Sequence, residues 1–232
     1  MAEFSRHIIA NFDAALTSLR NDVLMMASLA ELNLQNAVNG LLKRDSDLCN
    51  VAIADDEEID QLEKQVDKDG IDIMLRYQPV ATDLRRVVSA MKLGSNLERV
   101  ADQAVNIARR SKKLNQHTEL TESRLIEPIF QAASAILRDS LRAFTDDDIE
   151  LAMSLKKRDK ELDAMNRDFI STITEKMAAN PGQIRGYLNL IFISRYLERV
   201  GDHATNIAED AVWAVQAEDI RHTYNTPEAP TA

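Results

Sequence analysis

Hydrophobic side chains recur at spacings of three and four residues along almost the whole chain. From Phe4 to Leu41 they form one apolar stripe, and similar stripes follow the polar cluster at Asp45 and the break at Pro79. This spacing predicts amphipathic α-helices, because 3.6 residues make one helical turn. The expected helices cover about residues 4–41, 45–76, 79–114, 121–144, 148–179 and 183–218.

The second half of the chain repeats the first. The segment LERVADQAVNIARR at 97–110 returns as LERVGDHATNIAED at 197–210, and the preceding helices register at an offset of 103 residues. Self-similarity of this kind indicates a duplicated unit, and short connections make neighbouring helices antiparallel. We therefore expect an all-α fold of two tandem three-helix bundles, 1–115 and 119–221, followed by a disordered tail at 222–232.

The charge balance narrows the possible partners. Lys and Arg number 28 against 38 Asp and Glu, so the formal net charge is −10 and nucleic acid is an improbable partner. The single cysteine, Cys49, cannot form an intramolecular disulfide, which favours a reducing compartment. No apolar run approaches the roughly 20 residues of a membrane span, and the first residues do not resemble a signal peptide. The expected location is the cytoplasm.

Each repeat carries a row of oxygen-bearing side chains spaced four residues apart. The rows are Glu98, Asp102 and Asn106 in the first repeat, and Glu198, Asp202 and Asn206 in the second. A step of four residues advances only about 40° around a helix, so each row occupies one face. Neighbouring carboxylates repel one another, and an offsetting interaction is therefore expected.

The preceding helix of each unit adds an acidic pair on the flank of its apolar stripe. The pairs are Asp56 with Asp60, and Asp159 with Asp163. If adjacent helices bring pair and row together, hard oxygen ligands without His or Cys suit Mg, Mn, Fe or Ca rather than Zn or Cu. The alternative is a set of ordinary surface ion pairs with Arg99, Arg195 and Arg199.

Other candidate features have weaker support. The sequence contains no phosphate-binding glycine loop, no nucleophile elbow and no Glu-x-x-His pair, which argues against nucleotide hydrolysis and di-iron oxygen chemistry. Arg85, Arg86 and Arg185 lie near helix starts, where they would bind an anion or, more often, bridge helices. His203 is expected to be exposed or to face a partner.

The repeated segments, together with QPVATDLRRVVSAMK at 78–92, resemble the PhoU family of phosphate-transport regulators. The resemblance covers nearly the whole chain and implies two three-helix bundles whose ExxxD and DxxxD segments bind multinuclear clusters of iron or other metal ions. The ligands it implies are Glu98, Asp102, Glu198, Asp202, Asp56, Asp60, Asp159 and Asp163. The first repeat departs from the family in having Ala101 where the second has Gly201, a difference expected to matter only where packing is tight.

The resemblance also implies a role. It predicts a cytoplasmic negative regulator of phosphate uptake and of the phosphate-starvation regulon, without enzymatic activity. The implied partners are the ATPase subunit of the phosphate ABC transporter and the phosphate-sensing histidine kinase. A homodimer is plausible because apolar surface is in excess. Two other readings stay open from the residues alone, a metal-dependent hydrolase and a metal-free helical scaffold.

Overall fold

A computed structural model describes residues 2–221, with side chains described from residue 10 onward. Residues 2–221 form seven α-helices and two short 3₁₀ turns and contain no strand, which confirms the all-α prediction. The helices are α1 (Ala2–Leu42), α2 (Ser46–Ala54), α3 (Asp56–Tyr77), α4 (Ala81–Asn115), α5 (Ile126–Asp146), α6 (Ile149–Ala179) and α7 (Ile184–Gln216). The 3₁₀ turns are η1 (Thr121–Leu125) and η2 (Pro181–Gln183). The expected tail at 222–232 lies outside the described residues.

The expected helix 45–76 is two helices rather than one. Asp45 caps α2 as its position suggests, because its carboxylate accepts hydrogen bonds from the backbone N–H of Asp47 (2.9 Å) and Leu48 (3.2 Å). The break comes at Asp55, the first of four consecutive acidic residues. Because α3 begins at Asp56, three of these acids lie in its first turn, where the helix dipole favours negative charge, and not in the interior of a longer helix.

Other helix ends also differ slightly from the expectation. Pro79 lies in the connection and not in a first helical turn, because Gln78 ends α3 with a left-handed φ of 48° and α4 begins at Ala81. The fourth expected helix starts as the turn η1 before α5. After α6, Pro181 opens the turn η2, and α7 follows from Ile184 to Gln216.

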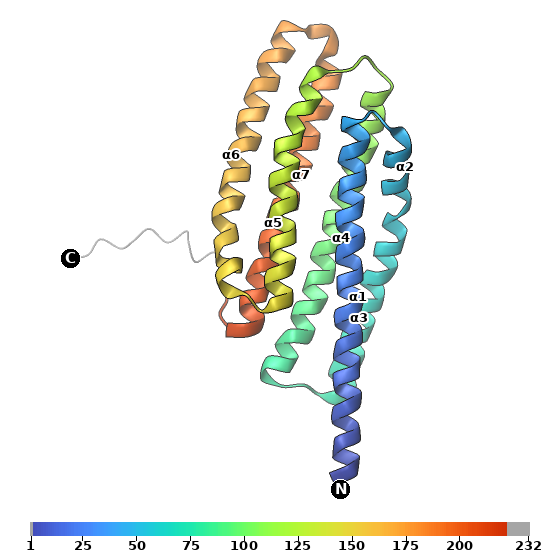
Figure 1. Cartoon of the computed structure of the whole chain (residues 1–232), viewed down its shortest axis with the longest axis vertical. Coiled ribbons are helices and arrows are strands. Elements are labelled where there is room, and N and C mark those ends of the chain that lie inside the picture. Colours follow the sequence, from blue (N-terminus) through green and yellow to red (C-terminus); the bar gives the residue numbers. More distant parts are fainter. Residues whose placement is uncertain (1, 222–232) are drawn as a thin grey trace, which may run out of the picture.

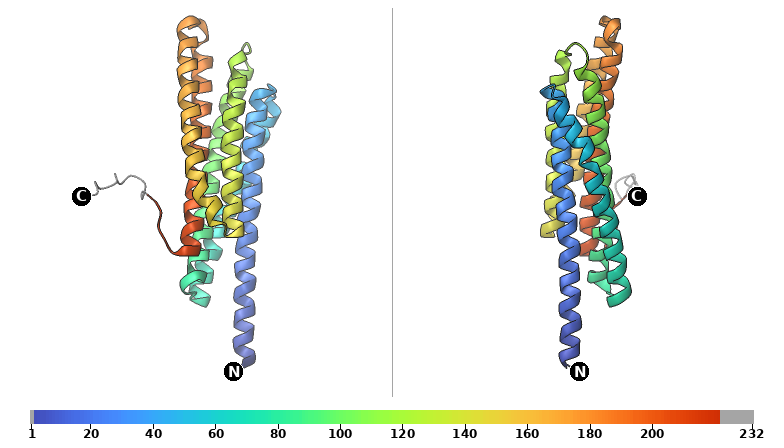
Figure 2. Two further views of the ribbon diagram at one scale, coloured as in Figure 1. Left: turned by 60° about the vertical axis from the view of Figure 1, so that its left-hand side comes forward. Right: turned by 90° about the vertical axis from the view of Figure 1, so that its right-hand side faces the viewer.

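The helices form two units that share a central pair. Helix α4 packs on α1, α2 and α3 in the first unit, and α7 packs on α5 and α6 in the second. Helices α4 and α7 also pack along each other, so that α1 and α5 cover one side of this pair (Figures 1 and 2). The other side is a face on which α3, α4, α7 and α6 follow one another. The acidic rows lie on the helices of this face.

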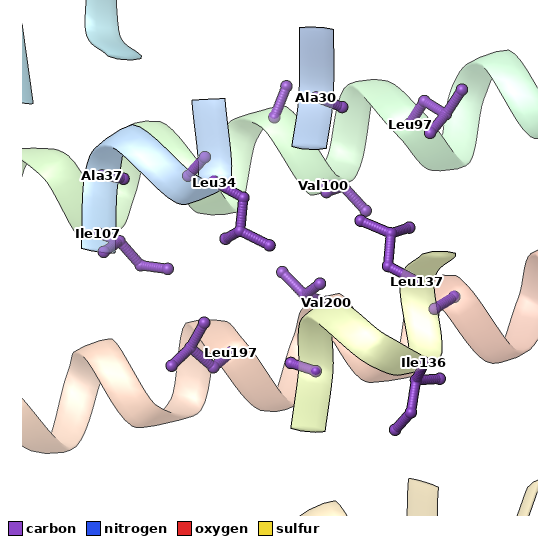
Figure 3. Close-up of a cluster of buried hydrophobic side chains, with 14 of the residues drawn as sticks. Ala30, Leu34, Ala37, Leu97, Val100, Ile107, Ile136, Leu137, Leu197 and Val200 are labelled. Carbon is purple, nitrogen blue, oxygen red and sulfur yellow. The ribbon is translucent and has the colours of Figure 1, made fainter. Parts of the chain in front are cut away.

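A single hydrophobic core runs through both units (Figure 3). Its middle is built from side chains that are at most 1% exposed: Ala30, Leu34 and Ala37 of α1, Leu97, Val100 and Ile107 of α4, Ile136 and Leu137 of α5, and Leu197 and Val200 of α7. Each helix contributes positions three or four residues apart, as its apolar stripe predicts. The core therefore fixes the rotation of α4 and α7 about their axes, and with it the direction of the acidic rows.

The two ends of the contact between α4 and α7 are formed by residues that are equivalent in the repeat. At one end Lys92 Nζ lies 2.9 Å from Asp210 Oδ1. The residues equivalent to this pair at the offset of 100 are Phe192 and Arg110, and at the other end the Arg110 guanidinium lies 3.8 Å above the Phe192 ring. The same two positions therefore hold an ion pair at one end and a cation–π contact at the other.

Gly201 lies where α7 approaches α6 closely. A Cβ atom at this position would lie 2.4 Å from Leu162 Cδ2 and 3.0 Å from Asp159 Oδ1, and Leu162 is fully buried. Packing is therefore tight at Gly201, the condition under which the difference from Ala101 is expected to matter, and a methyl group would clash there.

We predict that Gly201→Ala lowers the free energy of unfolding by about 1 kcal/mol. Overpacking costs about 1–3 kcal/mol, and higher helix propensity returns about 1 kcal/mol. Urea unfolding followed by circular dichroism measures the change. Gly182→Ala is the control, because no atom lies within 4 Å of its added Cβ. An equal effect of the two substitutions, or no relief of the Gly201→Ala effect by Leu162→Ala, would contradict the close-packing explanation.

Candidate metal centres

The first acidic cluster lies between α3 and α4. Asp56 and Asp60 stand one turn apart on α3, and Glu98 and Asp102 stand one turn apart on α4. Burial raises the pKa of Asp56, and repulsion from Asp60 and Asp102 raises it further. Asp56 thus interacts with an acid of the neighbouring helix as well as with one of its own. The two acidic pairs of this unit therefore lie close enough to repel one another, and their convergence on one shared ion stays a prediction.

Glu98 is the acid of this cluster with a buried oxygen that has no hydrogen-bond partner among residues 10–221. Its Oε2 is buried and accepts no hydrogen bond from any described residue, although the Arg99 Nε lies 3.3 Å away. Burial raises the pKa of Glu98, with further repulsion from Asp102, Glu63 and Asp60. The Glu98 carboxylate therefore lacks the donors that normally stabilise a buried anion.

Glu63 is a member of the first cluster that was missed from the sequence. It follows Asp60 by three residues on α3, and burial together with repulsion from Asp67 and Asp60 raises its pKa. At the offset of 103 its equivalent is Asn166, which is fully buried and whose side-chain atoms have no hydrogen-bond partner among the described residues. The signal was a further acid three residues after Asp60, about one helical turn along α3, and the absence of an acid at 166 concealed it.

The second cluster lies between α6 and α7. It joins Asp159 and Asp163 of α6 to Glu198 and Asp202 of α7. Partial desolvation raises the pKa of Asp202, and repulsion from Asp163 and Glu198 adds to this effect, although Asp202 remains open to solvent on its outer side. Both units therefore bring an acidic pair and an acidic row together.

Asp159 is the acid with the most perturbed ionisation in the two clusters. Its carboxylate lies against the backbone of Gly201, and its buried Oδ1 has no hydrogen-bond partner among the described residues. Burial raises the pKa of Asp159 to about 6, and repulsion from Asp202, Asp163 and Glu198 contributes. The absence of a side chain at Gly201 leaves room for this carboxylate, so Asp159 can occupy its position only where α6 and α7 approach closely at a glycine.

Arginines neutralise the clusters only in part. Arg195 Nη1 donates to Glu198 Oε2 at 2.7 Å, and Arg99 lies 3.3 Å from both Glu98 Oε2 and Asp102 Oδ2. The ion-pair alternative thus accounts for the outer acids, and it leaves the pairs on α3 and α6 without a salt bridge within 4.0 Å among the described residues. Among residues 10–221, no three His, Cys, Asp or Glu side chains already stand in ligand geometry. Buried, unpartnered carboxylate oxygens among like charges nevertheless fit a hard cation.

The two asparagines of the rows lie differently. Asn206 lines an open hollow of about 300 Å³ beside Lys92 and Asn96 of α4, and Asn106 is half-buried on α4. His203 is half-buried rather than exposed, and its Nδ1 lies 3.1 Å from Asn96 Oδ1. Burial lowers the pKa of His203 and the nearby Arg99 and Arg199 lower it further, so this histidine joins the two central helices in its neutral form at pH about 7.

Two of the three arginines near helix starts bridge helices. Arg85 Nε donates to the Ala214 carbonyl at 3.1 Å, and Arg86 forms an ion pair with Asp147 at 3.3 Å. Arg185 is exposed and forms no ion pair with a described residue. The bridging role thus holds for Arg85 and Arg86.

We predict that the metal-free protein loses stability as the pH rises through about 4 to 6. The folded state holds the Asp159 proton up to a pKa of about 6, whereas the unfolded chain releases it near 3.8, so deprotonation favours unfolding. Urea midpoints in a chelator, measured across this pH range, test the slope. Asp159→Asn should flatten the slope and raise the midpoint above pH 6, whereas Asp168→Asn, at an exposed position of α6, should change neither. A slope unchanged by Asp159→Asn would contradict the assignment.

Comparisons with known proteins agree with this architecture. Residues 23–111 and 126–211 each match the PhoU domain. The chain is 34% identical to the phosphate-specific transport system accessory protein PhoU homolog of Pseudomonas aeruginosa, over 94% of this chain and 90% of that protein. It is 31% identical to the PhoU accessory protein of Serratia marcescens, over 94% of this chain and 90% of that protein.

Solved structures show the same fold. The crystal structure of PhoU from Pseudomonas aeruginosa matches with a TM-score of 0.87 and 34% identity, over 89% of this chain and all of that chain. The phosphate transport system regulatory protein PhoU from Streptococcus pneumoniae matches with a TM-score of 0.81 and 25% identity, over 90% of this chain and 99% of that one. The hydrolase alternative is thereby set aside, because the matched family is regulatory and not enzymatic. Two PhoU domains in tandem, each with its acidic pair and row, show that the chain belongs to the PhoU family.

Proposed function

We propose that this protein regulates a phosphate-specific transport system and that metal ions held by its two acidic clusters support this role. The relatives named above are accessory or regulatory proteins of such systems, which supports the regulatory part. The observation that carries the metal part is the pair of buried carboxylate oxygens, Glu98 Oε2 and Asp159 Oδ1, which accept no hydrogen bond from the described residues and face further acids.

The ligands of the first centre would be Asp56, Asp60, Glu98 and Asp102, with Glu63 as an additional carboxylate. Those of the second would be Asp159, Asp163, Glu198 and Asp202. An all-oxygen donor set suits Mg, Mn or Fe, and such an ion supplies the positive charge that these carboxylates lack. Asn106 and Asn206 would act as outer oxygen ligands. In each unit the ligands come from two helices, so loading would hold α3 against α4 and α6 against α7.

In this proposal the protein is a cytoplasmic adaptor. It would bind the ATPase subunit of the phosphate ABC transporter and the phosphate-sensing histidine kinase, and restrain both when phosphate is plentiful. Residues 2–221 contain no helix long and apolar enough to cross a membrane. A regulator shifts its partner between states only by binding the states with different affinity. Rigid helix pairs suit this task, because a partner then meets one fixed surface.

We predict that protein purified without chelator contains Fe, Mn or Mg at one or more ions per chain. Glu198→Ala with Asp202→Ala should remove the share bound by the second cluster, because both acids of the α7 row are lost. Elemental analysis by mass spectrometry measures the content, and Asp168→Ala serves as the control on α6. Absence of any stoichiometric ion would support the metal-free scaffold instead.

We predict that a deletion strain shows phosphatase expression at high phosphate and that the wild-type protein represses it. The variant Glu98→Ala/Asp102→Ala/Glu198→Ala/Asp202→Ala should fail to repress at equal protein level, because its helix pairs lose their shared ions. Alkaline phosphatase activity per cell is the readout. Full repression by the fourfold variant would separate regulation from metal binding.

A further inference from the structure

The first turns of α7 carry an exposed apolar stripe. Its members Ile184, Leu188 and Phe192 follow one another at intervals of four residues and are 40%, 43% and 43% exposed. The sequence suggests that the two units could meet around Ile184, Leu188, Ile191 and Phe192. The structure shows a contact between the units at Phe192, which packs on Arg110 of α4, although all three residues of this α7 stripe keep an exposed surface.

The border of the α7 stripe is held in place by Arg110 of α4. Its guanidinium lies 3.8 Å above the Phe192 ring, donates to Asn189 Oδ1 at 3.0 Å and approaches the Tyr196 hydroxyl at 3.4 Å. These contacts fix the arginine without neutralising it, because both acceptors are uncharged. The apolar surface of Phe192 is thus joined to a permanent positive charge.

Two further cations lie beside the α7 stripe. Arg185 follows Ile184 directly, and Lys113 stands one turn beyond Arg110 on α4. We infer from the repeat that Lys113 faces Phe192, because the equivalent pair in the other unit is Trp213 with Lys92, whose Nζ lies 4.7 Å from the Trp213 ring centre. Arg110, Arg185 and Lys113 form no salt bridge with any residue of 10–221.

We propose that the α7 stripe and its three cations bind an acidic, amphipathic helix of a partner protein. A helix with apolar side chains at three- and four-residue spacing would lay them over Ile184, Leu188 and Phe192, and flanking Asp or Glu would meet the cations. The whole chain has a net charge of −10, so an acidic partner is repelled elsewhere and attracted at this surface.

The same charges argue against two other occupants. An anionic membrane is an extended surface, so it would meet the net charge of −10 of the whole chain as well as the three cations, and the α7 stripe offers it apolar surface only one helix wide. A second copy packed about a two-fold axis would bring Arg110, Arg185 and Lys113 against their own equivalents. The inference adds a binding surface for the proposed adaptor role, and because it is tested on the isolated protein, its failure is distinguishable from a failure in transport regulation.

The probe is a synthetic helical peptide of about 16 residues with Leu at the spacing of the α7 stripe and Glu at the other positions. We expect this peptide to bind the wild-type protein in a fluorescence anisotropy titration. The variant Leu188→Ala and the double variant Lys113→Glu/Arg185→Glu should each weaken its binding about tenfold. Raising NaCl from about 0.05 to about 0.5 M should also weaken binding to the wild-type protein, because salt screens the attraction between the Glu side chains and the cations. The control is Leu75→Ala, which removes a leucine that is 71% exposed on α3 and should leave binding unchanged.

Several results would overturn the proposal. These are no binding of the Glu peptide, equal binding of a peptide with Lys in place of Glu, or equal weakening by Leu75→Ala and Leu188→Ala. Sedimentation of the protein with phosphatidylglycerol vesicles that depends on Leu188 would assign the surface to a membrane. Self-association lost in Leu188→Ala would assign it to a second copy. Circular dichroism melting of every variant ensures that the folded proteins are compared.

Discussion

Helices α4 and α7 run antiparallel at the centre of the molecule, and the packing between them determines where every other helix lies. Arg85 meets Ala214 near one end of the pair, and Arg110 meets Asn189 near the other. Each helix also buries one side in the common core and turns another toward α3 or α6. Because a helix repeats every 3.6 residues, the rotation set by the core also sets the direction of the acidic rows.

Two opposing forces act where these rows meet the outer helices. Apolar packing, seen at Leu162 against Gly201, brings α6 close to α7, whereas the carboxylates beside it repel one another and lose solvent. The raised pKa of Asp159 and of Glu98 expresses this conflict in each unit. A bound cation would turn the repulsive groups into common ligands, so the metal-free and metal-loaded proteins would differ in how firmly the helix pairs hold.

Much of this arrangement could be predicted from the sequence, because it depends on local periodicity. The apolar spacing gave the long helices, and the step of four residues put Glu98 with Asp102 and Glu198 with Asp202 on shared faces. The break at Asp55 was missed, because an acidic run continues the helical pattern and only its interaction with the helix dipole interrupts it. The half-burial of His203 and the exposure of Leu188 depend on how two helices that are distant in the sequence pack together. The periodicity of one helix does not determine this packing.

The two ends of the α4–α7 contact hold different residues at equivalent positions, and this difference limits how the two halves can be combined. A protein made of two first units would place Lys92 against the arginine at 110, and one made of two second units would place Phe192 against Asp210. Either arrangement loses the attraction that each end has now. The halves are complementary rather than interchangeable, so neither half would pair as favourably with a copy of itself through this contact.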